Sequence, residues 1–330
     1  MKIRTLTSLA ATLALGASLA ACSADTADTA GDGTTKMTVG IIGIGSDAAI
    51  TTAIDKGYFA DEGLEVETTV VANPPAGIAA AQSGQLAVTY TPSIPVINAL
   101  SQNVDLKVIA AADGYDAKAM EDKGPYQVDD TALFVKPGSG ITRPKDLEGK
   151  KVAVPARKAQ IEVTVANLVV KDGGDPTKIN WMALDPASSL QSLEQGRVDA
   201  AGLVAPFSTN AKAQGMDLLG NPGLDFFGPG AVGLWVAGSK QVADDPESMA
   251  AFTRAIYKAN AYANGHPEEM DEVAVKITGI DAATIREGAQ DYWPLSVELD
   301  DLQNVSKKLA ELGYLTPEVS LNDDLIFKAK

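Results

Sequence analysis

From residue 37 onward, short apolar runs alternate along the chain with segments whose apolar residues recur every three or four positions. The short runs are typical of buried strands, and the spaced segments are typical of amphipathic helices. We expect strands over 38–44, 64–71, 86–90, 106–111, 131–135, 151–154, 179–184, 198–204 and 232–237, and helices over 48–56, 76–83, 94–102, 161–171, 188–194, 252–264, 270–278 and 302–312. Strands separated by helices predict an α/β fold with largely parallel sheets.

Two stretches of the chain resemble each other, IAAAQSGQL at 78–86 and LQSLEQGRV at 190–198. Each predicts a helix, a glycine that ends the helix, and a strand. A chain of 330 residues is also long enough for two domains. We therefore expect two lobes of similar construction. Their expected limits are 37–135 plus 232–330 for the first lobe and 136–231 for the second, with crossings near 133–137 and 230–234.

The composition excludes several classes of function. Asp and Glu total 43 against 27 Lys and Arg, a formal net charge of −16, which makes nucleic acid a poor partner because its binding requires basic side chains. One cysteine and one histidine cannot supply an internal disulfide or a His/Cys metal site. The chain contains no phosphate-binding glycine loop, dinucleotide loop or catalytic-serine motif. We expect no metal and no cofactor.

The first 21 residues have the pattern of a secretory signal. Lys2 and Arg4 precede an apolar stretch, 6–21, that is short for a membrane-spanning helix. The stretch ends Leu-Ala-Ala before Cys22, the only cysteine, and these four residues resemble the lipobox of bacterial lipoproteins. The resemblance implies that 1–21 is removed and Cys22 is lipid-modified. A plain signal peptide that happens to contain a cysteine is the alternative.

The segment that follows Cys22 has no large apolar side chain through Lys36, and Asp is its only charged residue before that lysine. Such a composition predicts a flexible tether rather than a packed element. Residues 22–36 would then hold the folded lobes near the outer face of the cell membrane through the lipid.

Three segments, in order, carry a family resemblance: AIDKGYF at 53–59 with EGLEV at 62–66, ITRPKDLEGKKV at 141–152, and QGRVDA at 195–200. Together they resemble substrate-binding proteins of ABC importers, in the branch that includes nitrate, sulfonate, taurine and thiamine-precursor binders. The resemblance implies the two-lobed periplasmic-binding-protein fold of type II, with a ligand cleft between the lobes. It also implies that the protein captures a small solute by hinge closure, passes it to a membrane permease and catalyses no reaction.

Loops that follow the strands are the expected site, because ligands of open α/β sheets bind beyond the carboxyl ends of the strands. The resemblance points to the same loops. Hydroxyl, amide and charged groups there could bind polar parts of a solute, and an aromatic ring could stack on one. The candidate residues are Ser46, Asp47, Asn73, Tyr90, Thr91, Ser93, Arg157, Gln160 and Phe207.

Two of these candidates carry opposite charges and suggest a solute class. An arginine such as Arg157 can bind a carboxylate, sulfonate or phosphate through two hydrogen bonds. A carboxylate such as Asp47 beside a purely anionic solute would be unfavourable. The pair therefore favours a zwitterionic or heterocyclic solute over nitrate. The loop at Pro206 also lacks the acidic residue that often precedes this proline in the family.

Two other functions stay open at the level of the sequence. The fold of this family also serves an enzyme of pyrimidine synthesis in the thiamine pathway, but that chemistry needs a reactive histidine. The single histidine, His266, lies in Asn-Gly-His-Pro at an expected helix end, away from the candidate loops. A lipoprotein that senses a ligand and signals to a partner is the other alternative.

Overall fold

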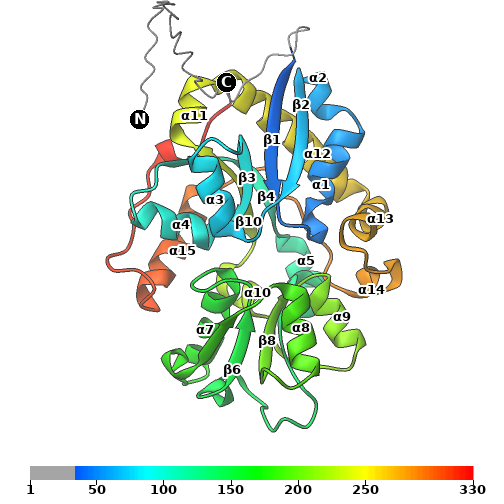
Figure 1. Ribbon diagram of the computed structural model, residues 1–330, viewed down its shortest axis with the longest axis vertical. Coiled ribbons are helices and arrows are strands. Elements are labelled where there is room, and N and C mark those ends of the chain that lie inside the picture. Colours follow the sequence, from blue (N-terminus) through cyan, green and yellow to red (C-terminus); the bar gives the residue numbers. More distant parts are fainter. Residues whose placement is uncertain (1–33, 330) are drawn as a thin grey trace, which may run out of the picture.

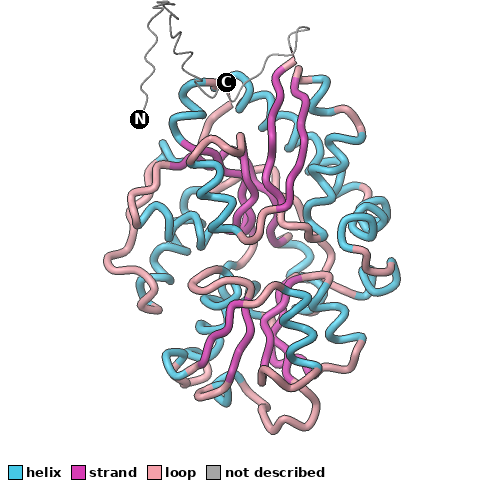
Figure 2. The backbone as a smooth tube through the Cα atoms, in the orientation of Figure 1, coloured by secondary structure: helices cyan, strands magenta, loops and turns pink. Residues whose placement is uncertain are grey.

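Two five-stranded sheets, one in each of two lobes, organise the chain (Figures 1 and 2). This computed structural model describes residues 34–329; the expected signal peptide, Cys22 and the tether through residue 33 lie outside this range. The expected α/β fold with two lobes is confirmed. In Figure 1 the first lobe lies above and the second lobe, in green, lies below.

The first sheet has the strand order β2-β1-β3-β10-β4. The strands are β1 (Thr35–Ile41), β2 (Leu64–Val70), β3 (Val88–Pro92), β4 (Leu106–Tyr115) and β10 (Gly230–Gly238). β1 pairs in parallel with β2 and β3, whereas β10 runs antiparallel between β3 and β4. β1 begins at Thr35, so the last two residues of the expected tether belong to the sheet.

The second sheet repeats this arrangement with the order β7-β6-β8-β5-β9. Its strands are β5 (Thr131–Val135), β6 (Lys151–Val154), β7 (Asn180–Ala183), β8 (Ala200–Val204) and β9 (Asp217–Gly220). β6 pairs in parallel with β7 and β8, and β5 runs antiparallel between β8 and β9. In both lobes, then, one antiparallel strand from a distant part of the chain lies between the last two strands.

The expected lobe boundaries need correction. Residues 131–135 were expected in the first lobe, but they form β5 of the second sheet. Residues 230–231, expected in the second lobe, begin β10 of the first. The chain therefore crosses between the sheets within 116–130 and again within 221–229. Apolar runs reveal strands, but they do not show which sheet a central antiparallel strand joins.

Helices cover both faces of each sheet. Those of the first lobe are α1 (Ala48–Asp55), α2 (Tyr58–Asp61), α3 (Pro74–Gln82), α4 (Ser93–Ser101), α11 (Ser239–Asp244), α12 (Pro246–Gly265), α13 (Pro267–Thr278), α14 (Ala282–Glu287) and α15 (Leu299–Glu311). Those of the second lobe are α7 (Gln160–Lys171), α8 (Pro186–Glu194), α9 (Phe207–Ala213) and α10 (Pro222–Phe227), with α5 (Ala117–Asp122) and α6 (Pro125–Val128) on the first crossing. The two resembling stretches occupy equivalent places, α3 to β3 and α8 to β8. No helix within 34–329 is long and apolar enough to span a bilayer.

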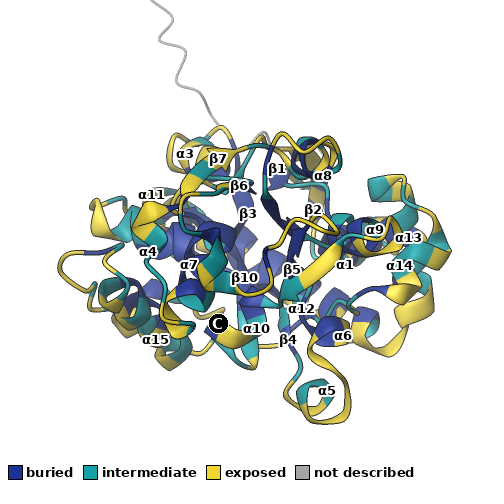
Figure 3. Cartoon of the chain, turned by 90° about the horizontal axis from the view of Figure 1, so that it is seen from below, coloured by how far each residue is buried: buried dark blue, intermediate teal, exposed yellow. Residues whose placement is uncertain are grey.

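The core of the first lobe lies between its sheet and α12. Phe59 and Phe252 stack with ring centroids 5.3 Å apart, and Trp235 meets Phe252 edge-on at 5.9 Å. Figure 3 shows the strands as the buried centre of the molecule, with exposed surface on the surrounding helices and loops. Burial of such aromatic rings is a main source of stability in a fold of this kind.

A separate apolar cluster joins the two lobes. Buried residues of α4 and α15, including Ile97 and Leu309, pack in one cluster with Val163 of α7 and Phe226 of α10. The C-terminal part of the chain thus contacts the second lobe, although it belongs to the first. The two lobes thus pack against each other through this cluster.

Candidate functional site

A cavity of about 110 Å³ lies between the lobes, where strands of both sheets end. We call it the interlobe cavity. Apolar side chains form most of its wall, among them Ile42, Val71 and Pro92 from the first lobe and Ile161 and Val204 from the second. Its polar side chains are Asn73, Tyr90, Asp130, Thr131, Gln160 and Asp185. An apolar wall with a few polar groups is the usual composition of a small-molecule site.

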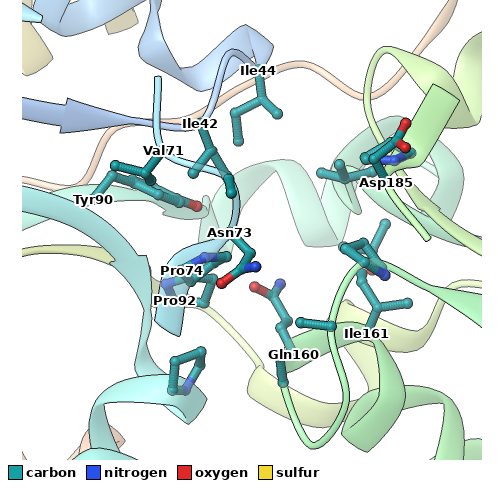
Figure 4. A pocket seen from close by; sticks show the side chains of 18 of the residues that line it. Ile42, Ile44, Val71, Asn73, Pro74, Tyr90, Pro92, Gln160, Ile161 and Asp185 are labelled. Carbon is teal, nitrogen blue, oxygen red and sulfur yellow. The ribbon is translucent and has the colours of Figure 1, made fainter. Parts of the chain in front are cut away.

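The first lobe contributes Asn73 and Tyr90. Asn73 precedes α3, and its Oδ1 accepts a hydrogen bond of 3.0 Å from Ala76 N, which fixes the side chain as a helix cap. Tyr90 is 4% exposed and meets Trp235 edge-on at 6.0 Å. Burial, and then the neighbouring Asp113, raises the pKa of Tyr90 well above its usual value. Its hydroxyl therefore stays protonated and points into the interlobe cavity (Figure 4).

The second lobe contributes Gln160, the first residue of α7, together with Asp130 and Asp185. The amides of Asn73 and Gln160 point toward one another from opposite lobes (Figure 4). Asp185 precedes α8, and its Oδ1 accepts 2.9 Å from Ser188 N. Hydrogen bonds from Ser188 lower the pKa of Asp185, so this carboxylate is charged.

Of the nine candidate residues, Asn73, Tyr90 and Gln160 line the interlobe cavity. Asn73 caps α3, Gln160 begins α7 and Tyr90 lies near the carboxyl end of β3, in agreement with the rule that ligands bind beyond strand ends. Their contact with a solute stays a prediction.

Ser46 and Asp47 do not line the interlobe cavity. Ser46 donates 2.7 Å from Oγ to Asp113 Oδ2, and its carbonyl accepts 2.9 Å from Trp293 Nε1. Asp47 is 1% exposed, and its Oδ2 accepts from Gly43 N at 2.7 Å and Ile44 N at 3.0 Å. The side chain of Asp47 thus holds its own loop, so the expected solute contact is not supported. Burial raises the pKa of Asp47 to about 7.

Thr91 and Ser93 are fully buried and also lie outside the cavity wall. Thr91 Oγ1 donates 3.2 Å to the carbonyl of Pro92, within its own turn. Ser93 is the first residue of α4, and its Oγ has no hydrogen-bond partner among the described residues. Between them, Pro92 lines the cavity with its apolar ring.

Arg157 and Phe207 point to local partners instead of the cavity. Arg157 Nε donates 2.6 Å to Glu162 Oε2, whose side chain is only 3% exposed. Phe207 packs against the apolar cluster that includes Leu203 and Ala211. The structure therefore does not support the expected pairing of Asp47 with Arg157 around a zwitterion, because each side chain is hydrogen-bonded to residues close to it in the chain.

The candidate list missed Asp130, Thr131 and Asp185. Asp185 follows the expected strand 179–184, so the same rule could have identified it. Asp130 precedes β5 and Thr131 is its first residue, so both lie at the amino end of a strand. Because β5 runs antiparallel to β8, with Thr131 opposite Val204, its amino end lies beside the carboxyl ends of the parallel strands. Only the strand direction, which the sequence does not show, reveals this position.

Neither a metal site nor a histidine marks this region. Within residues 34–329 no group of three or more His, Cys, Asp or Glu side chains is arranged to hold a metal ion. The ring of His266 stacks on Tyr262 with centroids 3.8 Å apart, and its Nδ1 lies 2.8 Å from the Tyr262 carbonyl. His266 lies at the end of α12 and outside the cavity wall.

A larger hollow of about 490 Å³ lies elsewhere in the first lobe. Thr35 at the start of β1, Gln82 at the end of α3 and Lys240 of α11 are among its lining residues. This hollow is at the amino end of β1, and the second lobe contributes nothing to it. Its position does not match the strand ends at which ligands of α/β sheets bind.

Three comparisons relate this architecture to known proteins. The family model described as NMT1/THI5 like matches residues 46–270. A protein of Brucella abortus (strain 2308), named as a candidate binding protein, is 24% identical over 268 residues, which are 80% of this chain and 77% of the relative.

Solved structures with the same fold include two binding proteins. The alkanesulfonate-binding protein SsuA from Xanthomonas axonopodis pv. citri, bound to MOPS, superposes with a TM-score of 0.70 at 14% identity, over 86% of this chain and 95% of that one. The nitrate-binding protein NrtA from Synechocystis PCC 6803 gives a TM-score of 0.70 at 12% identity, over 87% and 83% of the two chains. The family match spans more than half of the chain, and the fold agrees with it along nearly its whole described length. The chain therefore belongs to the NMT1/THI5-like family and has the two-lobed fold of periplasmic binding proteins.

Proposed function

We propose that this chain is an extracytoplasmic solute-binding protein of an ABC importer and catalyses no reaction of its own. The observation that carries the proposal is the interlobe cavity. Both lobes line it, and it lies at the strand ends where ligands of such sheets bind. Relatives with the same fold carry the names of sulfonate- and nitrate-binding proteins, which supports a transport role.

The solute is a small organic compound of the sulfonate, pyrimidine or thiamine-precursor class, or another zwitterionic or heterocyclic molecule. Apolar side chains of both lobes would bury its carbon skeleton, while Asn73, Tyr90 and Gln160 would hydrogen-bond its polar groups. Closure of the lobes would enclose the solute, and the closed form would dock on a permease. A lipid on Cys22 would hold the protein at the outer face of the cell membrane.

A thermal-shift experiment tests solute binding. The full chain, kept in a non-ionic detergent, is unfolded and refolded to release bound solute. It is then screened against sulfonates, pyrimidines, thiamine precursors, amino acids and amines. A solute at about 100 times its Kd adds ~2.7 kcal/mol to the free energy of unfolding, which raises Tm by several degrees.

Two variants show where the solute binds. Gln160→Leu changes the cavity wall, whereas Gln195→Leu makes the same change at an exposed residue that follows α8. We expect the shift to persist in Gln195→Leu and to shrink in Gln160→Leu. A panel without any shift, or an equal shift in all three proteins, would contradict the proposal.

A further inference from the structure

The charged side chains around the interlobe cavity are of one sign. Asp130 and Asp185 line it, and no Lys, Arg or His is among its lining residues. Arg157 lies between the wall residues Ala156 and Ala159 along the chain, and its guanidinium is paired with Glu162 of α7. An anionic solute would therefore meet two carboxyl groups and no basic side chain in this wall.

More carboxylates lie behind the wall. Asp113 approaches Tyr90, Asp129 precedes Asp130, and Asp291 lines a small space together with Asp113 and Asp130. None of these carboxylates forms an ion pair with a basic residue of the described chain. Their partners are hydroxyl and backbone groups, such as Ser46 Oγ for Asp113 and Leu224 N for Asp129. These carboxyl groups thus have no cationic partner on the protein side.

The backbone at the starts of α3 and α8 offers little to an anion. Free N–H groups at helix starts bind anions in many α/β proteins. At α3 and α8 side chains of the protein already accept such groups, since Asn73 Oδ1 accepts from Ala76 N and Asp185 Oδ1 accepts from Ser188 N, whereas α7 has no side-chain cap. Proline, which has no N–H, occupies the first position of both α3 and α8.

From this arrangement we infer that the solute is an organic cation whose charged nitrogen lies beside Asp130. This inference rests on the proposed function and narrows its solute class. The apolar body of the solute lies against Ile42 and Val71 of the first lobe and Ile161 and Val204 of the second. Asp130 is the better partner of the two carboxylates, because Asp185 is exposed at the rim and already caps α8.

Binding of a cation at Asp130 is coupled to a proton. Burial, followed by the charges of Asp113, Asp129 and Asp291, raises the pKa of Asp130 well above its usual value, against a hydrogen bond from Tyr115 that lowers it. Asp130 thus faces three carboxyl groups, the hydroxyl of Tyr115 and the protonated hydroxyl of Tyr90. A cation stabilises the ionised carboxylate, so Asp130 releases its proton on binding and the affinity rises with pH.

Two sets of compounds, each with one carbon skeleton and a different charge on each member, test the inference on the full chain. The probes are benzylamine, benzyl alcohol and benzoate, with butylamine, butanol and butanesulfonate as an aliphatic set. We expect the amines to raise Tm and the anions not to. A shift with benzoate or butanesulfonate alone would overturn the inference but leave the proposed function standing. No shift with any of the six would overturn the inference, whereas the proposed function would fail only if its own wider panel also gave no shift.

Two variants sharpen this test. Asp130→Asn keeps the shape and the acceptor for Tyr115 but removes the charge, and Asp217→Asn does the same at an exposed carboxylate of β9 outside the cavity. We expect Asp130→Asn to weaken amine binding on the order of 30-fold. It should also abolish the proton release that calorimetry detects in buffers of different ionisation enthalpy. Unchanged amine affinity and proton release in Asp130→Asn, with a normal Tm, would overturn the inference.

Discussion

Asn98 of α4 and Lys158 of the second lobe are joined directly from lobe to lobe: Asn98 Nδ2 donates 2.7 Å to the Lys158 carbonyl. Lys158 has a φ of +56°, a left-handed conformation that is uncommon for a residue with a side chain. Its own N–H is held by Glu162 Oε2 at 2.9 Å. The hydrogen bond therefore connects a helix of one lobe to a constrained turn of the other.

Removal of this bond should favour the open form. Asn98→Ala leaves α4 intact but removes a hydrogen bond worth about 1 kcal/mol, so we expect about a fivefold weaker apparent affinity for the solute. The change should appear mainly as faster dissociation, measured by stopped-flow competition. Gln102→Ala, at the exposed end of the same helix, is the matched control. Equal rates in both variants would mean that the bond does not hold the lobes together.

Arg157 should matter for stability and not for affinity. Its guanidinium neutralises the buried Glu162, which also accepts from Lys158 N and, at 3.3 Å, from Tyr314 Oη. Since Arg157 is half exposed and Glu162 keeps two other donors, Arg157→Gln should lower the free energy of unfolding by only about 1 kcal/mol. Denaturant titration and calorimetry measure the two effects. A large loss of affinity with unchanged stability would restore Arg157 as a solute contact.

Stability should fall as pH rises toward neutrality. The pKa of Asp47 is 3.8 in an unperturbed chain and about 7 when buried in the fold. The protonated form of Asp47 thus favours folding. This contribution is full below about pH 4 and is lost as pH rises through 7, on the order of 4 kcal/mol in all. Asp113 and Asp291, whose pKa burial also raises, act in the same direction.

Asp47→Asn isolates this effect, because its amide oxygen still accepts from Gly43 and Ile44. The variant should lose part of the decline in the free energy of unfolding between pH 5 and pH 8, measured by urea titration. A decline identical to that of the parent chain would show that Asp47 does not titrate in this interval.

The aromatic core of the first lobe should be sensitive to truncation. Phe252 is fully buried between Phe59 and Trp235, so Phe252→Ala should lower the free energy of unfolding by about 3–5 kcal/mol, and Phe252→Leu by less. Thermal and urea unfolding give both values. Equal losses of the free energy of unfolding in the two variants would argue against tight packing around Phe252.

Cys22 provides a test of membrane attachment that is independent of the folded lobes. If a lipid on Cys22 holds the protein, Cys22→Ser should move it from the membrane fraction to the soluble fraction and abolish labelling by palmitate. A variant that stays in the membrane fraction and keeps its label would contradict lipid attachment at this residue.

The sequence predicts the fold well because its signals are local. Apolar runs and glycine stops identify all but one of the strands, and the repeated helix–glycine–strand pattern indicates two equivalent lobes. The exception, β9, is a four-residue strand at the edge of its sheet, two of whose residues, including Leu218, are exposed, so it has no clear apolar run.

The site is harder to predict because it depends on contacts between distant segments. Asn73, Tyr90 and Gln160 follow from the rule for strand ends. Asp130 does not, because its place depends on the direction of β5. Asp47 and Arg157 are hydrogen-bonded to residues close to them in the chain, and a residue type alone does not distinguish such a bond from a contact with a solute.

The central claim is that the interlobe cavity holds the solute. A crystal structure of the full chain, purified without unfolding so that its natural solute is retained, tests this most directly. The account predicts density for an organic molecule between Tyr90 and Gln160, with a nitrogen near Asp130 and the hydrogen bond from Asn98 to Lys158 in place. A bound solute in the hollow near Thr35, with only water between the lobes, would contradict it.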